Sequence, residues 1–501
     1  MSRELGMSRG GAGLRAAYPG GTDRRPPVSC QKWDQSMFGR QSLVTLVILG
    51  CLVLLALAGC RGVRQIRDPE YAEVLNRAAQ AAVAAEPGPA AVPPPGVLTG
   101  PQPVEAYIAL ALAQNPDIQA ARKRVDALAN RVPQAASLND PMFGVTVFPA
   151  PIQTAAGQQD VALTASQQLP WPGKLRRRAE AAEAETDVAR AQLAAVELEV
   201  IEQVKRAYYE LYFIDRAIEI TEKDRELLVQ FTRIAESKYR TGETSQQDVL
   251  RAQVEVLNID NELIRLRQQH DSAQARLARL LHVSPETPLR PLAELPEEQL
   301  PAELEALYEL AIQARPELHA ELAAIRRDRV QVELAQLDYF PDLTAGATWI
   351  EVGDAGLSPV ANGEDAVLLG FSVNLPIYRR RLDAAVREAE ARMVSTARRY
   401  DSLRDRTAEA VKDLYAQAIS QYELVRLFRE EIIPKAQQTL DVSTSAYQVG
   451  DVDFLQLIDN WQQLLRFEIT RYRLESQFQR TLASLERMTD DPAGWTFQSL
   501  A

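Results

Sequence analysis

The spacing of apolar residues alternates between a two-residue and a helical period along the chain. Val367 to Leu375 has Val, Leu, Phe, Val and Leu on one face and Leu, Gly, Ser and Asn on the other. Such alternation predicts a half-buried strand. Val161 to Gln168 repeats it more weakly, and Met142 to Phe148 and Leu343 to Ile350 supply partner strands. We therefore predict two hairpins, with strands near 142–149, 161–169, 343–351 and 366–375.

Long helical segments follow the second strand of each pair. No proline occurs from Gly173 to Lys238, so one helix of about 66 residues, on the order of 100 Å, can form there. A returning helix is predicted through about Leu281, and shorter helices at 103–136 and 303–337 are expected to stack beside the long ones. Apolar residues in the long segments advance by four and three, the seam of a coiled coil: Val200, Val204, Ala207, Leu211, Ile214 and Ile218, and then Val411, Tyr415, Ala418, Tyr422 and Val425.

The same order of features occurs twice. Three landmarks recur at offsets of 200 to 208 residues: Asn115-Pro116-Asp117-Ile118 with Arg315-Pro316-Glu317-Leu318, Leu169-Pro170 with Leu375-Pro376, and Tyr239-Arg240-Thr241-Gly242 with Tyr447-Gln448-Val449-Gly450. So small a drift favours duplication of one unit of about 200 residues. We place the repeats at 103–290 and 303–489, with a C-terminal tail at 490–501.

Each repeat contains a strand-to-helix junction of similar chemistry. Pro170 and Pro376 end a strand because proline cannot donate to the ladder. The amphipathic rings of Trp171 and Tyr378 follow, and such rings suit the interface between a bilayer and water. Strands of this length, apolar on one face and small or polar on the other, have the weak signature of an outer-membrane barrel. The N-terminal segment decides whether that signature applies.

The N-terminal segment predicts export and lipidation. Leu43 to Ala58 is an apolar run of about 16 residues, suited to a signal-peptide core rather than a membrane span. It ends at Leu57-Ala58-Gly59-Cys60, which resembles the bacterial lipobox, with Cys60 as the lipid acceptor. Residues 1–59 are therefore predicted as the signal peptide, and a start at Met37 would make 1–36 an overextension. Residues 60–102, rich in Pro and Ala, are predicted as a tether.

Charge and cysteine content exclude several classes of function. The formal net charge is −12, and removal of the signal segment with its net +4 makes it −16. A chain this acidic is a poor nucleic-acid binder. Cys30 and Cys51 are predicted to be removed with the signal peptide, and Cys60 to be acylated. No thiol would then remain for a disulfide or a metal. We expect no cofactor and no metal site.

Taken together, the duplicated landmarks resemble TolC-type outer-membrane efflux channels, also called outer-membrane factors. The resemblance covers about residues 103–489, and the lipobox is similar to that of the lipidated drug- and metal-efflux members. It implies a long antiparallel helical barrel and four strands per chain in a trimeric, 12-strand membrane barrel. An oligomer is also expected independently, because four strands cannot close a barrel and an open edge is not viable in lipid.

The resemblance also implies location and partners. A homotrimer would sit in outer-membrane lipid, anchored by Cys60 and extending into the periplasm. There it would meet a periplasmic adaptor, also called a membrane fusion protein, and an inner-membrane pump of RND type. The function implied is passive export of a substrate that the pump drives. The sequence leaves open whether the substrate is a metal, drug, dye or polypeptide.

In this family the periplasmic tips close the tube through an aspartate ring and a tyrosine-centred hydrogen-bond network. By resemblance, Gly242 and Gly450 form the tip turns. The gate candidates are Asp459, Asp453, Asp248, Tyr447 and Tyr239. Two residues depart from the pattern: Gln456 replaces an aspartate found in many members, and Val452 replaces a basic residue found in some.

Two other classes of function compete with a channel. An enzyme is not expected, because His270, His282 and His319 share no metal-ligand spacing and no Gly-x-Ser-x-Gly or His-Glu-x-x-His motif occurs. A lipid-anchored periplasmic coiled-coil scaffold without a channel fits the lipobox and the heptads. It does not explain why four proline-bounded alternating segments recur at corresponding places.

Overall fold

The structure is a computed structural model. The chain divides into two units, Met1–Gly88 and Pro89–Ala501, and the helices and strands discussed below all belong to the second. The residues described are 70–71, 100–295, 303–354, 356–357 and 362–489.

Several predictions from the sequence concern other residues. The signal segment 1–59, the lipidation site Cys60, most of the tether 60–102 and the tail 490–501 lie outside the described residues. Within the described part of the second unit, no helix combines the length and the apolar composition needed to cross a membrane.

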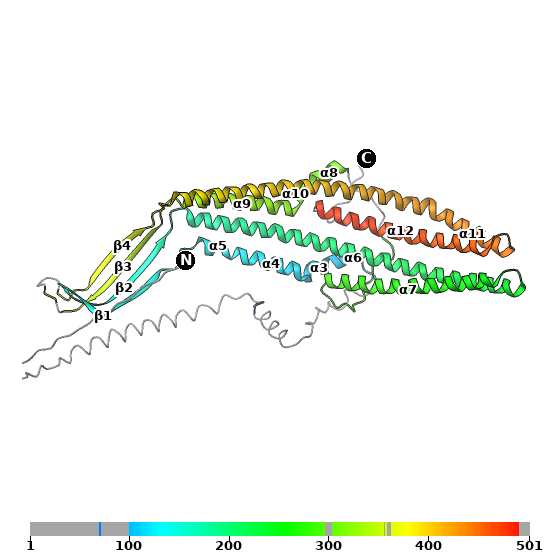
Figure 1. Ribbon diagram of the computed structural model, residues 1–501, viewed down its shortest axis with the longest axis horizontal. Helices are drawn as coiled ribbons and strands as arrows, with labels where there is room; N and C mark the ends of the chain where they lie inside the picture. Colours follow the sequence, from blue (N-terminus) through cyan, green and yellow to red (C-terminus); the bar gives the residue numbers. More distant parts are fainter. Residues whose placement is uncertain (1–69, 72–99, 296–302, 355, 358–361, 490–501) are drawn as a thin grey trace, which may run out of the picture. The chain divides into compact units, whose positions relative to one another are not determined.

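The element order runs through the same series twice (Figure 1). The first series is α3 (Val104–Gln114), α4 (Pro116–Ala129), α5 (Arg131–Ala136), β1 (Met142–Thr154), β2 (Gly157–Leu169), α6 (Lys174–Thr241) and α7 (Gln246–Leu280). The second is α8 (Leu304–Ala314), α9 (Pro316–Leu337), β3 (Leu343–Val352), β4 (Ala366–Val373), α10 (Arg379–Leu427), the π-helix η1 (Phe428–Ile432), α11 (Ile433–Val449) and α12 (Phe454–Thr489).

The repeated proline motif starts a helix in both series. Pro116 and Pro316 stand at the first position of α4 and α9, where the missing N–H is not needed. Asn115 caps α4, because its side-chain oxygen accepts from the N–H of Asp117 at 2.9 Å. Its amide nitrogen donates to the carbonyl of Leu280 at 2.9 Å. This cap therefore also joins the start of α4 to the end of α7.

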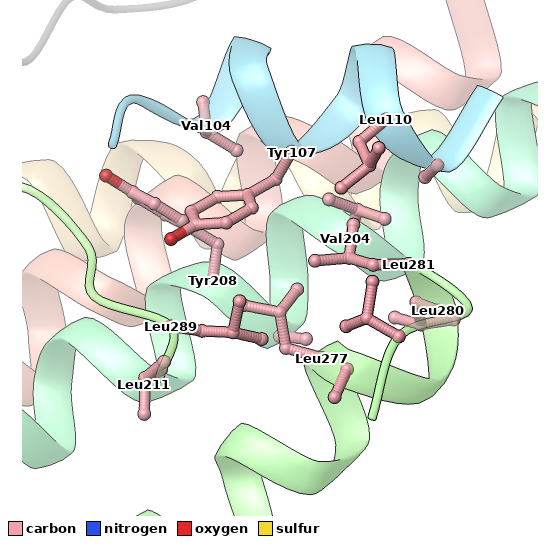
Figure 2. Close-up of a cluster of buried hydrophobic side chains, with 14 of the residues drawn as sticks. Val104, Tyr107, Leu110, Val204, Tyr208, Leu211, Leu277, Leu280, Leu281 and Leu289 are labelled. Carbon is pink, nitrogen blue, oxygen red and sulfur yellow. The ribbon is translucent and has the colours of Figure 1, made fainter. Parts of the chain in front are cut away.

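The predicted heptad seam of α6 is a packing surface. Val200, Val204, Ala207, Leu211 and Ile214 are all buried. Figure 2 shows the centre of this core, in which side chains from α3 and α7 converge on α6. The residues labelled there are Val104, Tyr107, Leu110, Val204, Tyr208, Leu211, Leu277, Leu280, Leu281 and Leu289. A seam of this kind stabilises the helical wall.

The long helix of the second series is interrupted, whereas α6 runs for 68 residues without a break. The π-turn η1 separates α10 from α11, and Pro434 lies in the first turn of α11. Proline has no N–H, and its ring clashes with the carbonyl four residues earlier, so a regular α-helix cannot pass through this point. Inserting a π-turn is a common way to accommodate such a conflict.

The strands form one antiparallel sheet in the order β1-β2-β3-β4. All four predicted strands are present, but β1 reaches Thr154 rather than 149 and β4 ends at Val373 rather than 375. The pairing of β1 with β2 shifts register between Val147 and Ile152. Pro149 and Pro151 lie in that irregular stretch, where a ladder N–H is not required. The predicted end of this strand near residue 149 was therefore wrong, because β1 continues past both prolines.

Candidate functional site

One face of the sheet is mainly apolar on all four strands, with Gln167 of β2 as a polar exception. Pairing places Phe143 beside Ala165, Ala165 beside Ala347, and Ala347 beside Leu369. The same face carries Val145, Val147, Leu163, Trp349, Leu343, Val367, Phe371 and Val373. Most of these side chains are exposed in the single chain, and Phe371 is 75% exposed. The opposite face carries Gly144, Thr146, Thr164, Ser166, Gly346, Thr348, Gly370 and Ser372. This second face also carries Met142, Ile350 and Leu368, so the contrast between the faces is clear but not complete. In membrane barrels the apolar face of such strands contacts lipid.

A buried lysine joins the first strand-to-helix junction to the start of β3. Lys174, the first residue of α6, is 3% exposed. Its Nζ lies 2.9 Å from Asp342 Oδ1 and 3.2 Å from Asp338 Oδ1. The same Asp342 oxygen accepts a hydrogen bond from the N–H of Trp171 at 2.8 Å. Burial by itself would raise the pKa of Asp342, but the bonds from Trp171 and Lys174 hold that pKa below its ordinary value.

Further contacts fix the same junction. The Trp171 ring stacks on Phe340, with centroids 5.0 Å apart and planes at 17°. Asn374 follows β4, and its N–H donates to the carbonyl of Asp342 at 3.3 Å, while its side chain accepts from the Asp342 N–H. Gly173 has a φ of 97°, which an L side chain rarely adopts. The first junction is therefore packed against residues of the second repeat.

The second junction is more open. Pro376 leads into Tyr378, which is 73% exposed and precedes the first residue of α10. The guanidinium of Arg379 lies over the ring of Tyr339, 5.4 Å from its centroid. The hydroxyl of Tyr339 donates to Asp383. The exposed aromatic ring of Tyr378 therefore differs in environment from that of Trp171. Pro170 directly follows β2, but β4 ends at Val373, so the prediction that Pro376 ends a strand was wrong.

Both hairpin tips use the same turn. Gly242 and Gly450 follow α6 and α11 with φ of 79° and 86°. In each case the N–H one residue further on reaches back to a carbonyl in the last helical turn: from Glu243 to Lys238 and from Asp451 to Ala446, both at 2.9 Å. This is the glycine-terminated Schellman motif. It reverses the chain sharply, so that α7 returns along α6 and α12 along α11 (Figure 1).

The three candidate acids near the tips have different environments. Asp453 caps α12, because its carboxylate accepts from the N–H of Gln456 at 2.8 Å. Asp248 is half-buried and accepts from the hydroxyl of Thr244. Asp459 is exposed on α12, and within the described part of the chain its carboxylate forms no hydrogen bond or ion pair. Of the three acids, Asp459 is therefore the one whose carboxylate is most available to groups outside its own chain.

The two candidate tyrosines also differ. Tyr239 is 46% exposed, whereas Tyr447 is buried with its ring 5.5 Å from Phe454 and under the Nζ of Lys238 at 5.0 Å. Among the described residues, none forms a hydrogen bond of normal geometry with the Tyr447 hydroxyl. Burial and Asp248 raise the pKa of Tyr447, and the nearby Thr244 hydroxyl lowers it. Within one chain, Tyr447 is thus a packing residue with an unsatisfied hydroxyl, and the proposed hydrogen-bond network stays a prediction.

A buried polar contact joins the two hairpins. Trp461 on α12 is 1% exposed, and its Nε1 donates to Asp224 of α6 at 3.2 Å. Burial and the neighbouring Glu468 raise the pKa of Asp224 to about 7, although the Trp461 bond lowers it. The surrounding core draws on α6, α7, α11 and α12, with Leu228, Phe231, Ile259, Leu440, Phe454, Leu457 and Leu464 among its members. The tips of the two repeats are therefore packed as one bundle.

A family model fits most of this architecture. Residues 107–282 and 307–490 match the model described as outer membrane efflux protein. The chain belongs to the outer membrane efflux protein family. Members are outer-membrane channel components of tripartite efflux systems and act as ducts without enzymatic activity. These channels are trimers that partner with adaptor proteins and inner-membrane pumps, and they extend into the periplasm.

Alignments with similar proteins cover most of this outer membrane efflux protein. The cobalt-zinc-cadmium resistance protein CzcC of Cupriavidus metallidurans is 23% identical over 410 residues, which are 79% of this chain and 91% of CzcC. The solved channel CusC superposes with a TM-score of 0.67 at 19% identity, over 78% of this chain and 93% of CusC. The outer membrane protein VceC of Vibrio cholerae gives 0.64 at 21% identity, over 77% and 95%. The predicted fold class, a helical barrel joined to a membrane barrel, is confirmed.

Sequence reasoning missed two features of this efflux protein. Asp342 was overlooked because its partners Lys174 and Trp171 lie about 170 residues away in the sequence. Trp461 and Asp224 are 237 residues apart and lie in different hairpins. A buried charge at the very start of a helix and a tryptophan in a heptad core are the only local signals that point to them.

Proposed function

We propose that the protein is a lipid-anchored, trimeric exit duct for metal cations, supplied by an RND-type inner-membrane pump through a periplasmic adaptor. The observation that carries the duct is the sheet, whose edges are β1 and β4 and whose one face is mainly apolar. Open edges are not viable in lipid, and three copies would supply the twelve strands of a closed barrel.

The helical wall also has two margins suited to another copy. α6 and α12 pack on each other, while α7 packs on α6 and α11 packs on α12 (Figure 1). α7 exposes an apolar stripe at heptad spacing on the side away from α6: Leu250, Val254, Leu257 and Ile264. α11 exposes Val442 and Val449, also seven residues apart. Side chains spaced in this way pack between helices, so we assign the α7 stripe to α11 of the next copy.

Leu257→Glu is expected to weaken the trimer, because Leu257 lies mid-stripe, 65% exposed in one chain, and would be buried by the next copy. Native mass spectrometry of the detergent-solubilised protein should show monomer appearing at concentrations at which the parent is trimeric. Asn258→Glu adds the same charge one residue away, off the stripe, and should leave the trimer intact. Equal dissociation of both variants, or of neither, would contradict the assigned contact.

Metal cations are the proposed cargo for two reasons. CzcC, which aligns over most of both chains, is named for cobalt, zinc and cadmium resistance. In addition, the second tip carries Asp451, Asp453 and Asp459 within nine residues, and threefold symmetry would triple each of them. Carboxylates crowded around an axis attract cations and repel anions. The proposed gate is the exposed Asp459, with Asp453 and Asp248 as weaker contributors.

Asp459→Ala should reduce cation selectivity or divalent-cation block in single-channel recordings from planar bilayers, because it removes one carboxylate per chain from the proposed constriction. This recording also tests the duct, since the parent must conduct. Asp405→Ala is the control, because Asp405 is an exposed acid on α10 with 74% of its side chain accessible. If the parent conducts and Asp459→Ala has unchanged cation selectivity, the gate does not lie at Asp459. A parent that inserts but never conducts would refute the duct.

Tyr447→Phe removes the hydroxyl and keeps the ring, so the same recordings can distinguish the contribution of each to gating. The ring should keep its packing on Phe454 and Lys238. If a neighbouring copy supplies the hydroxyl's partner in the closed trimer, losing that bond removes about 0.5 to 1.5 kcal/mol and shifts the gate toward open. The expected result is more frequent opening with selectivity retained.

Cys60 should be the mature N-terminus and carry the lipid, because its thiol is the acceptor in the lipobox-like Leu57-Ala58-Gly59-Cys60. Intact-protein mass spectrometry should give the mass of residues 60–501 plus acyl groups. Cys60→Ala delivered by another signal should remain in the membrane, since a lipid is a modest anchor beside an inserted barrel. An unmodified Cys60, or an N-terminus well upstream, would contradict the lipid anchor.

A further inference from the structure

Three arginines line a hollow of about 360 Å³ between α6, α7 and α12. Arg276 comes from α7, and Arg473 and Arg480 come from α12. Glu210 of α6 is the one carboxylate among the described residues that line it. The lining thus carries three positive charges against one negative charge, in a chain whose net charge is −12. We call this hollow the arginine pocket.

Two of the guanidinium groups are held in place by their neighbours. Arg276 Nη1 lies 2.7 Å from Glu210 Oε2, an ion pair between α7 and α6. The guanidinium of Arg473 lies over the ring of Phe213, 5.4 Å from its centroid. This cation–π contact orients Arg473 and leaves its charge uncompensated. Glu210 can therefore balance only one of the three charges.

Arg480 is the group most in need of an anion. It is half-buried, and in the described part of the chain no carboxylate lies within ion-pair distance of it. Its pKa lies below the usual arginine range, chiefly because burial disfavours the charge; Glu210 attracts the charge, and Arg206 and Arg276 repel it. A guanidinium cannot escape such repulsion by losing its proton at neutral pH.

Nearby acids outside the pocket are already paired. Glu475 is 5% exposed, and its Oε1 lies 2.9 Å from Arg429 and 3.1 Å from Arg471. Glu202 pairs with Arg487 at 3.1 Å and with Arg206 at 3.3 Å. The remaining polar lining consists of neutral amides and hydroxyls, including Gln269, Ser272 and Gln477. No carboxylate in this set pairs with Arg480, so its charge is available to an anionic ligand.

We propose that the arginine pocket binds a phosphate group, as free inorganic phosphate or as a phosphate monoester. The planar guanidinium fork matches a tetrahedral oxyanion, and a dianion would offset the net charge of +2 on the lining. The volume falls at the lower end of the range for small-molecule sites. Arg276 belongs to the first repeat and Arg480 to the second, so one ligand would bridge the two repeats across α6.

The test is isothermal titration of the full-length protein in detergent with inorganic phosphate and, separately, with glycerol 3-phosphate. Arg480→Gln should weaken binding by about tenfold or more, because it removes a charge-assisted bond. Arg251→Gln, which changes an exposed arginine elsewhere on α7, should bind like the parent. Comparing the two ligands tells which source of the phosphate group the site prefers.

Glu210→Gln is a control for the possibility that Arg480→Gln loses phosphate binding only because it misfolds. Removing the competing carboxylate should tighten phosphate binding by about threefold, a gain that a damaged protein cannot give. Phosphate should also raise the melting temperature of the parent and of Glu210→Gln but not of Arg480→Gln, because a ligand that binds only the folded state stabilises it. Absence of binding by the parent, or equal losses in Arg480→Gln and Arg251→Gln, would overturn the proposal.

Discussion

Asp342→Ala is expected to lower the free energy of unfolding by about 1 to 3 kcal/mol, the usual cost of leaving a buried polar group without one of its partners. Lys174 would stay 3% exposed without its nearer carboxylate, and the N–H of Trp171 would lose its acceptor. Chemical denaturation of the detergent-solubilised protein, followed by circular dichroism, measures the change. The junction between β2 and α6 should lose order first.

Asp338→Ala is the matched control, since Asp338 also faces Lys174 but is 53% exposed at 3.2 Å. Exposed pairs contribute about 0 to 1 kcal/mol, so this variant should be close to the parent. The pKa of Asp342 is below its ordinary 3.8, so its contribution is complete above that pH and is lost as the pH falls through the folded-state pKa. Equal losses from both variants would mean that Asp342 has no special role.

Phe371→Arg is expected to cost about 2 to 4 kcal/mol if the residue sits near the bilayer midplane. Phe371 lies mid-strand in β4, opposite Ala345, on the mainly apolar face. Urea titration of the protein refolded into lipid vesicles gives the change directly. Folding into vesicles matters here, because detergent can cover an isolated charge more easily than a bilayer can.

Ser372→Arg provides the comparison, because Ser372 is the next residue and faces the other side of the sheet, opposite Thr344. A charge on a water-filled side should be tolerated, so this variant should fold nearly as well as the parent. A larger cost at Ser372 than at Phe371 would mean that the lipid and water faces are assigned the wrong way round.

Local pattern was enough to predict the elements of this fold. Alternation over Val367–Val373 and the heptads of α6 each reflect a face that must be buried, and burial has a period that can be counted in the sequence. The pattern of apolar residues could not predict changes in backbone geometry that leave the period of buried residues unchanged. The register shift near Pro149 let β1 continue, and Pro434 forced a π-turn into a helix whose apolar spacing gave no warning.

The candidate site was less accessible to sequence reasoning. The turns at Gly242 and Gly450 could be located, since a left-handed residue after a helix strongly favours glycine. The environments of Asp248, Asp453 and Asp459 could not, because capping and burial depend on where neighbouring helices lie. The Lys174–Asp342 pair joins the two repeats, and a single sequence carries no sign of which distant residues meet.

The π-turn at Phe428–Ile432 makes the two hairpins mechanically unequal. α6 is one uninterrupted rod, whereas α10 and α11 meet at a point where the hydrogen-bond ladder slips by one residue. Bending there needs little additional loss of hydrogen bonding. In a trimer, three interrupted α10–α11 helices would then alternate with three continuous α6 helices around the ring. Because α11 shares one core with α6, α7 and α12, a bend at this turn would change the angle between α10 and the whole tip bundle rather than move α11 alone.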